Sequence, residues 1–159
     1  MAALLNKEIR DLFAHPDTVK VLATLDAAGL PHAVVRQSLQ VGDDGNLFYT
    51  ELLESSRTNK NLVHSIWYDK QVSIAIQGPE GQSYQIRGVP VKTHITGPLF
   101  QKHYSEVRRK LGDVDLAAVW IIKPLEVINE NFAVLKAEEE LNHPFLKHLD
   151  RLAGRKRTE

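Results

Sequence analysis

The chain has 159 residues, 43% of them hydrophobic, and its 20 basic side chains balance 20 acidic ones. This length is typical of one domain, so we expect a single domain over residues 1–159. A net charge of zero argues against nucleic acid or a membrane surface as the main partner. The absence of cysteine excludes thiolate chemistry and disulfides, so any redox activity would need an organic cofactor or haem.

The N-terminal residues predict an amphipathic helix. Leu5, Ile9, Leu12 and Phe13 recur at helical spacing, which predicts a helix over residues 3–14. Charged residues interrupt this stretch, whereas a signal peptide has a continuous apolar run. No later segment approaches the ~20 apolar residues that a membrane span needs. We therefore expect a cytoplasmic protein with neither a membrane nor a nucleic acid as its partner.

Two strands with alternating apolar residues are predicted next. The first has an apolar face made of Val19, Val21, Ala23 and Leu25. The second is predicted as one strand over residues 32–41, with an apolar face made of Ala33, Val35, Leu39 and Val41. Its opposite face carries His32, Val34, Arg36, Ser38 and Gln40. This polar face is either simply solvated or part of a groove that Arg36 shares with Thr50 and Arg57.

The rest of the chain predicts four more strands and three helices. Turn residues between the apolar runs indicate antiparallel hairpins, and Gly88 and Pro90 indicate a bend in a long strand. The acidic run Glu138–Glu140 is interpreted as a solvated connection. The strands are expected over residues 47–50, 71–77, 84–96 and 117–128, and the helices over residues 57–66, 98–111 and 144–153. We expect a mainly β fold, an antiparallel six-stranded Greek-key-like barrel with helices, and an open α+β sheet is the alternative.

The segment "SSRTNKN", residues 55–61, has the chemistry of an anion site. A helix that begins there directs unpaired N–H groups, hydroxyls and the cations of Arg57 and Lys60 toward one place, and a phosphate is the natural ligand. The alternative is an ordinary surface helix capped by Ser55 or Ser56, with solvated cations. Cations in a first helical turn oppose the helix dipole, which favours the anion site.

Other catalytic signatures are absent from the sequence. The seven histidines do not cluster at metal-ligand spacing, and we predict no metal site. There is no nucleophile elbow, phosphate-binding glycine loop or evident pair of catalytic carboxylates. Chemistry would therefore have to come from a bound cofactor.

Four stretches together resemble the FMN-binding split barrels related to pyridoxamine 5′-phosphate oxidase. These stretches are "VLATLDAAGLPHAVV", "LFYT", "SSRTNKNL" and "QVSIAI", and the resemblance covers roughly residues 17–128. It implies a homodimer in which an FMN lies at each end of the shared interface, and it leads us to expect that dimerisation hides part of the strand around Val119–Ile121. Deazaflavin and haem are the alternative cofactors.

The resemblance also assigns cofactor-binding residues. It implies that the FMN phosphate is held by Ser56, Arg57 and Thr58, with Lys60 or Asn61 behind them. It implies that the ring is lined by Val34, Val35, Arg36, Gln37, Ser38, Tyr49 and Thr50, with Gln77 at the polar edge of the ring. Thr58 stands where many relatives have lysine, which leaves Arg57, hydroxyls and backbone donors to balance the phosphate.

The C-terminal sequence departs from the true pyridoxamine phosphate oxidases. Those enzymes bind their substrate with a tryptophan and an arginine–histidine motif. The C-terminal stretch "NHPFLKHLDRLAGRKRTE", residues 142–159, does not match this motif. The resemblance therefore predicts an FMN-dependent oxidoreductase that moves hydride or electrons between a donor such as NAD(P)H and an unidentified small acceptor. No catalytic residue is assigned. The alternative is a non-catalytic flavin or haem binder that serves as an electron carrier or redox sensor.

Overall fold

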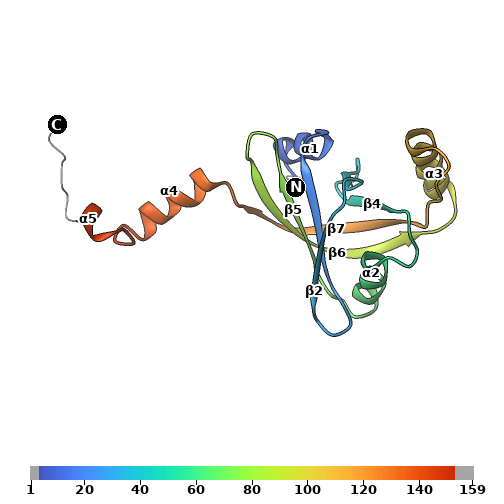
Figure 1. Cartoon of the computed structure of the whole chain (residues 1–159), viewed down its shortest axis with the longest axis horizontal. Helices are drawn as coiled ribbons and strands as arrows, with labels where there is room; N and C mark the ends of the chain where they lie inside the picture. The colour runs from blue at the N-terminus through green and yellow to red at the C-terminus, as the bar shows by residue number, and fades with distance from the viewer. Residues whose placement is uncertain (1–3, 153–159) are drawn as a thin grey trace.

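A computed structural model describes residues 4–152, and its centre is a seven-stranded antiparallel sheet (Figure 1). The strand order is β2-β1-β5-β6-β7-β4-β3. The strands are β1 (Val19–Leu25), β2 (Pro31–Val35), β3 (Gln40–Val41), β4 (Leu47–Glu51), β5 (Val72–Gln77), β6 (Ser83–His94) and β7 (Ala118–Asn129). The helices are α1 (Lys7–Ala14), α2 (Arg57–Trp67), α3 (Pro98–Leu111), α4 (Phe132–Asn142) and α5 (Leu149–Leu152). The expected mainly β, barrel-like fold is confirmed, with seven strands instead of six.

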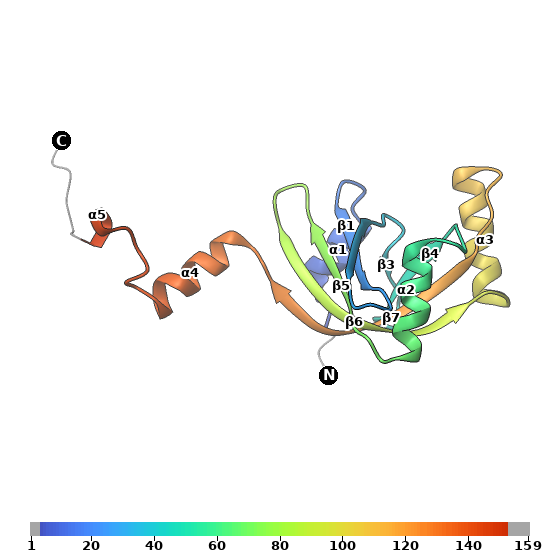
Figure 2. The ribbon, with the colours of Figure 1, turned by 60° about the horizontal axis from the view of Figure 1, so that its bottom comes forward.

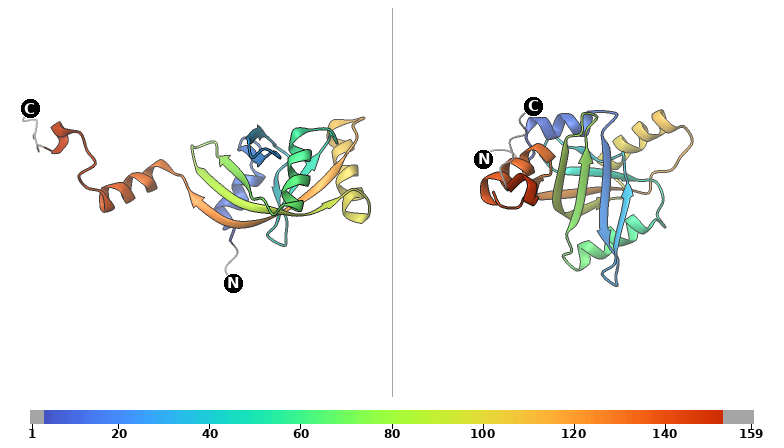
Figure 3. Two further views of the ribbon diagram at one scale, coloured as in Figure 1. Left: turned by 90° about the horizontal axis from the view of Figure 1, so that it is seen from below. Right: turned by 60° about the vertical axis from the view of Figure 1, so that its left-hand side comes forward.

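The two longest strands, β6 and β7, curl the sheet into a half-barrel (Figures 2 and 3). Their register shifts between Arg87 and Gly88 and again between Pro90 and Lys92, which confirms the bend expected there. A Cβ atom at Gly88 would lie 2.8 Å from the carbonyl oxygen of Lys123, so only glycine allows this close approach of the two backbones. The curl brings the two edge strands of the sheet, β2 and β3, toward each other.

The strand expected over residues 32–41 is divided into β2 and β3. The Arg36 N–H donates to the Lys20 carbonyl at 2.8 Å, and the Leu39 N–H then donates to the Arg36 carbonyl at 3.2 Å, which turns the chain. As a result β2 and β3 are the two edges of the sheet although they follow each other in sequence. Residues 36–39 therefore bridge the split between the edges, and β1 pairs with β5 instead of continuing a simple meander.

The inward face of β1 is opposite to the expected one. Lys20, Leu22 and Thr24 are buried, whereas Val19 is 43% exposed. The two polar side chains are satisfied inside: the Lys20 ammonium donates to two backbone carbonyls at 3.0 and 2.8 Å, and the Thr24 hydroxyl accepts from Asn61 at 3.0 Å. Hydrogen bonding therefore outweighs the apolar character of the other face.

Strand β2 also points inward with the face opposite to the one expected. His32 and Val34 are half-buried, whereas Ala33 and Val35, which were expected in the core, are exposed. By contrast, Val72, Ile74 and Ile76 of β5 are buried, as their alternation predicts. The polar side of β2 consequently points toward the inside of the half-barrel.

Helix α1 starts later than the expected residue 3, which lies outside the described residues. The Asn6 side chain caps it by accepting from the Ile9 N–H at 3.0 Å. Ile9, Leu12 and Phe13 are buried and join the main core. Val119 and Trp120 are already buried within the single chain, and Ile121 is half-buried.

The C-terminal segment differs from the expected helix over residues 144–153. The structure has α4 before this stretch, and the short α5 inside it. The run "FAVLKAEEELN" consists mostly of good helix formers, so Glu138–Glu140 are helical instead of forming a connection. We call residues 130–152 the C-terminal arm, and it leads away from the sheet in Figures 1 and 2. None of the helices in residues 4–152 has the length and apolar character of a membrane span.

Candidate functional site

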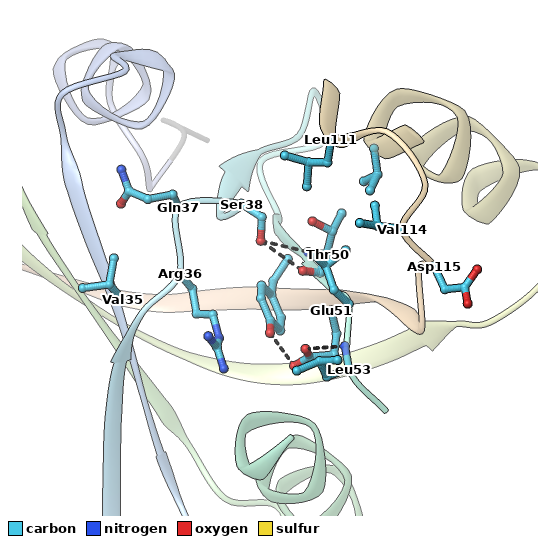
Figure 4. Close-up of a pocket in the computed structure, with 13 residues that line it drawn as sticks. Val35, Arg36, Gln37, Ser38, Thr50, Glu51, Leu53, Leu111, Val114 and Asp115 are labelled. Atoms are coloured by element: carbon cyan, nitrogen blue, oxygen red, sulfur yellow. Dashed lines mark hydrogen bonds between the residues drawn. The ribbon is translucent and has the colours of Figure 1, made fainter. Parts of the chain in front are cut away.

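A cavity of about 780 Å³ lies at the split between the sheet edges (Figure 4). A volume of this size is in the range of small-molecule sites. Its walls come from the link between β2 and β3, from the end of β4 and from α3 with the loop that follows. The lining residues are Val35, Arg36, Gln37, Ser38, Tyr49, Thr50, Glu51, Leu52, Leu53, Val107, Leu111, Val114 and Asp115.

The cavity brings together most of the residues expected to line the flavin ring. All of them except Val34 and Gln77 are in its wall. The Ser38 hydroxyl donates to the Thr50 carbonyl oxygen at 3.1 Å, and this contact joins the two wall segments. Val34 pairs with Leu22 inside the sheet. Gln77 is exposed at the end of β5 and lines neither this cavity nor the second one described below.

Arg36 is the main cation of the cavity. Its Nη2 donates to the Thr58 hydroxyl at 3.1 Å, and its guanidinium carbon lies 5.9 Å from the centre of the Tyr49 ring. The Arg36 Nε is buried and has no hydrogen-bond partner within the described residues. A buried donor normally has an acceptor. The Thr58 contact thus holds the side chain in place, while the Nε–H group stays unpaired within the described residues.

Glu51 is a buried carboxylate that sequence reasoning did not single out. It is 3% exposed and accepts from the Tyr49 hydroxyl, from the Ser56 hydroxyl at 2.6 Å and from the Leu53 N–H at 3.0 Å. Burial raises the pKa of Tyr49, and the hydrogen bond to Glu51 raises it further. The alternation of the strand could have indicated that Glu51 is buried, because Leu47, Tyr49 and Glu51 share the inward face of β4.

The predicted phosphate-binding residues divide into engaged and free side chains. Ser56 is the N-cap of α2, as one alternative had it, and its hydroxyl also donates to Glu51. Thr58 is fully buried against Arg36, and Asn61 donates to Thr24. The side chains of Arg57 and Lys60 are exposed. These two cations, with the first-turn N–H groups, are the part of the segment that could hold a phosphate.

A second cavity of about 480 Å³ lies on the side of α2 where these cations are. It is lined by Asp26, Leu30, Pro31, His32, Arg57, Lys60 and Asn61. The Nδ1 atom of His32 is buried there without a hydrogen-bond partner among the described residues. The two cavities share no lining residue, but both border β2, the first at Val35 and the second at Pro31 and His32.

Helix α3 forms the outer wall of the first cavity and is held by one buried side chain, His103. The His103 ring lies 4.8 Å from the Phe48 ring, centre to centre, and its Nδ1 is 3.7 Å from a Glu106 oxygen. Burial lowers the pKa of His103, although the Glu106 carboxylate opposes this shift. Val107 of the cavity wall is one helical turn further along.

Comparison with solved structures identifies the fold. HupZ from Group A Streptococcus aligns with a TM-score of 0.67 at 22% identity, over 80% of this chain and 94% of that one. An FMN-binding protein from Syntrophomonas wolfei aligns with a TM-score of 0.67 at 13% identity, over 80% and 86% of the chains. A putative pyridoxamine 5′-phosphate oxidase from Lactobacillus delbrueckii aligns with a TM-score of 0.64 at 20% identity, over 80% and 95%. This chain has the split-barrel fold.

Other split barrels that align with the chain differ in what their names say they bind. HutZ from Vibrio cholerae, a heme storage protein, aligns with a TM-score of 0.58 at 17% identity, over 79% of this chain and 94% of that one. An F420 reductase aligns with a TM-score of 0.55 at 15% identity, over 75% and 94%. No protein-family model and no curated protein matches the sequence. The fold of the split barrel is therefore compatible with flavin, deazaflavin and haem proteins.

Proposed function

We propose that this protein is a cytoplasmic FMN-binding oxidoreductase that works as a homodimer with the cofactor at the subunit interface. It would transfer hydride or electrons between a reduced donor such as NAD(P)H and a small acceptor. The isoalloxazine ring would supply the redox chemistry, and the protein would supply binding, orientation and the exclusion of water.

One observation carries this proposal: the two segments predicted to contact a flavin ring line a single cavity. Residues 35–38 begin at β2, one edge strand of the sheet, and residues 49–50 belong to β4, which lies next to the other edge strand. Both segments nevertheless line the same cavity. The same fold in an FMN-binding protein supports the assignment.

Each wall would have a separate role toward the ring. Val107, Leu111 and Val114 offer an apolar surface that excludes water from a planar ligand. On the other side, Arg36 brings a positive charge to the cavity wall, which would stabilise negative charge on the reduced ring.

The phosphate would be held by Arg57 and Lys60 with the first-turn N–H groups of α2. Their side chains are exposed and line the 480-Å³ cavity, so they are accessible to a dianion. The Ser56 and Thr58 hydroxyls are engaged elsewhere and would contribute indirectly, by capping α2 and by positioning Arg36.

The homodimer is supported by an unusual apolar stripe on the outward face of the sheet. Val21 pairs with Val35 on one side and with Ala75 on the other, and Ala23 pairs with Ala33. Val35 is 51% exposed and also lines the cavity. A second copy packed on this stripe would cover both the apolar surface and the open side of the cavity.

The test compares FMN with riboflavin, which lacks the phosphate. The wild type should prefer FMN, and the double substitution R57A/K60A should abolish that preference while leaving riboflavin affinity unchanged. Charge-assisted hydrogen bonds of about 1.5–3 kcal/mol predict a loss of roughly 10- to 100-fold in FMN affinity for each contact removed.

The matched control is K92A/K123A, which removes two exposed lysines elsewhere and should change neither affinity. Failure of the wild type to bind either flavin would overturn the proposal. If NADH or NADPH reduces the bound flavin and an acceptor is turned over, the protein is an enzyme. If flavin binds without turnover, the protein is an electron carrier or redox sensor.

Haem is the second candidate, and Glu51 favours it. The Glu51 carboxylate already occupies the Ser56 hydroxyl and a backbone donor near the start of α2, where a phosphate would otherwise find them. A haem needs no phosphate site there, and a heme storage protein shares the fold. The absorption spectrum of the purified protein separates haem, flavin and deazaflavin directly.

A further inference from the structure

We propose that the C-terminal arm of one copy packs along helix α3 of a second copy, at the edge of the 780-Å³ cavity. This inference builds on the homodimer of the proposed function but does not depend on which cofactor is bound. The partner copy would thereby contribute residues to the rim of the ligand site.

The arm exposes an unusual amount of apolar surface for an ordered segment. Phe132 is 78% exposed, Leu141 81% and Phe145 81%, and no residue of α4 is buried. An isolated helix of 11 residues is marginal in water, because its few hydrogen bonds hardly offset the lost chain entropy. A helix of this kind gains its stability by packing on another surface, so the arm requires a binding surface that the described chain does not provide.

Helix α3 offers a surface of complementary charge. The arm carries Glu138–Glu140 in consecutive positions, and the last turn of α3 carries Arg108–Lys110, all of them exposed. Arg108 already contacts the exposed Asp113 at 3.0 Å, which leaves Arg109 and Lys110 as the main partners for the acidic run. Leu111 follows these cations directly and is 59% exposed.

The apolar residues near α3 also lie where the cavity opens. Leu111 and the exposed Leu53 both line the 780-Å³ cavity. An arm helix aligned with its acidic run on Arg109 and Lys110 could place Leu141 or Phe145 on these leucines. The contact would bury apolar surface on both sides and narrow the mouth of the cavity.

The two surfaces cannot meet within one chain. Helix α3 precedes β7 and the arm follows it, and a strand of 12 residues extends up to roughly 40 Å. Figures 1 and 2 both show α3 and α4 at opposite ends of the molecule. The contact must therefore form between copies, and a two-fold axis forms it twice in one dimer.

Charge reversal tests this contact. The arm variant is E138K/E139K/E140K, and the helix variant is R108E/R109E/K110E. In a homodimer of either variant the arm and α3 carry like charges. In a mixed dimer of the two variants both contacts pair opposite charges again. Sedimentation velocity should show wild-type dimers, at least a tenfold weaker dimer for each variant alone, and recovery of a dimer in the equimolar mixture.

Controls separate repulsion from misfolding. Circular dichroism checks that each variant keeps the wild-type β signal, and D17K/D43K/E80K makes the same charge change at exposed positions outside the contact. This control should dimerise like the wild type. Unchanged dimerisation of the arm variant, no recovery in the mixture, or a monomeric wild type would each overturn the proposal. Flavin titration is a separate measurement, so failure of the cofactor assignment would not be confused with failure of this contact.

Discussion

Arg36 donates a hydrogen bond to the Thr58 hydroxyl at 3.1 Å, and this contact connects the end of β2 with the first turn of α2. The two residues are 22 positions apart in the chain. Because Thr58 is fully buried, the bond restrains the guanidinium beside the cavity, and its Nε has no partner among the described residues. A ligand-binding cation is thus positioned by a residue that itself need not touch the ligand.

Substitution of Arg36 should weaken cofactor binding more than it weakens the fold. R36A removes a charged donor, for which about 1.5–3 kcal/mol is typical, so flavin affinity should fall roughly 10- to 100-fold. R36K should recover part of this loss, because an ammonium keeps the charge but not the planar fork. Fluorescence titration measures the affinity, and the thermal midpoint of the unliganded protein serves as the stability control. Equal affinity of R36A and wild type would remove Arg36 from the site.

The Tyr49–Glu51 pair should make stability depend on alkaline pH. Burial and Glu51 place the pKa of Tyr49 above its unfolded value of 10.0, so the folded state holds this proton more tightly. The resulting stability is fully present below about pH 10 and is lost as the pH rises above that value. Y49F should show a smaller alkaline loss, measured by chemical denaturation at several pH values. It should also cost about 1–3 kcal/mol near neutral pH, because Glu51 loses a buried donor.

His103 should make stability depend on acid pH in the opposite sense. Burial lowers its pKa in the folded state below the unfolded value of 6.5, so the unfolded chain binds the proton more readily. Stability is therefore complete above about pH 6.5 and falls as the pH decreases toward the folded pKa. H103F should make the thermal midpoint less dependent on pH between about pH 5 and 7, roughly the range in which histidine titrates. A wild-type midpoint that stays constant through this range would contradict the prediction. E106Q tests the opposing carboxylate, since its removal should lower the folded pKa further and steepen the acid loss.

Several features of the site could be predicted because they depend on residues close in sequence. Ser56 caps α2 because it directly precedes the helix, and Gly88 bends β6 because only glycine allows the backbone approach. The ring-lining segments were found through the resemblance, and the structure brings all but Val34 and Gln77 to one cavity. Glu51 was missed because a carboxylate in a strand is usually exposed, and only its three donors explain its burial.

The sequence by itself determined the type and approximate position of most strands and helices, since periodicity, capping and turn chemistry act over a few residues. Only the tertiary structure decided which face of β1 points inward, because both faces contain apolar residues and the choice depends on partners for Lys20 and Thr24 that lie elsewhere in the chain. It also decided that residues 36–39 bridge the split, because that turn is held by hydrogen bonds between Lys20 of β1 and the backbone of Arg36 and Leu39. Long-range hydrogen bonding, which no local pattern records, thus placed the cavity.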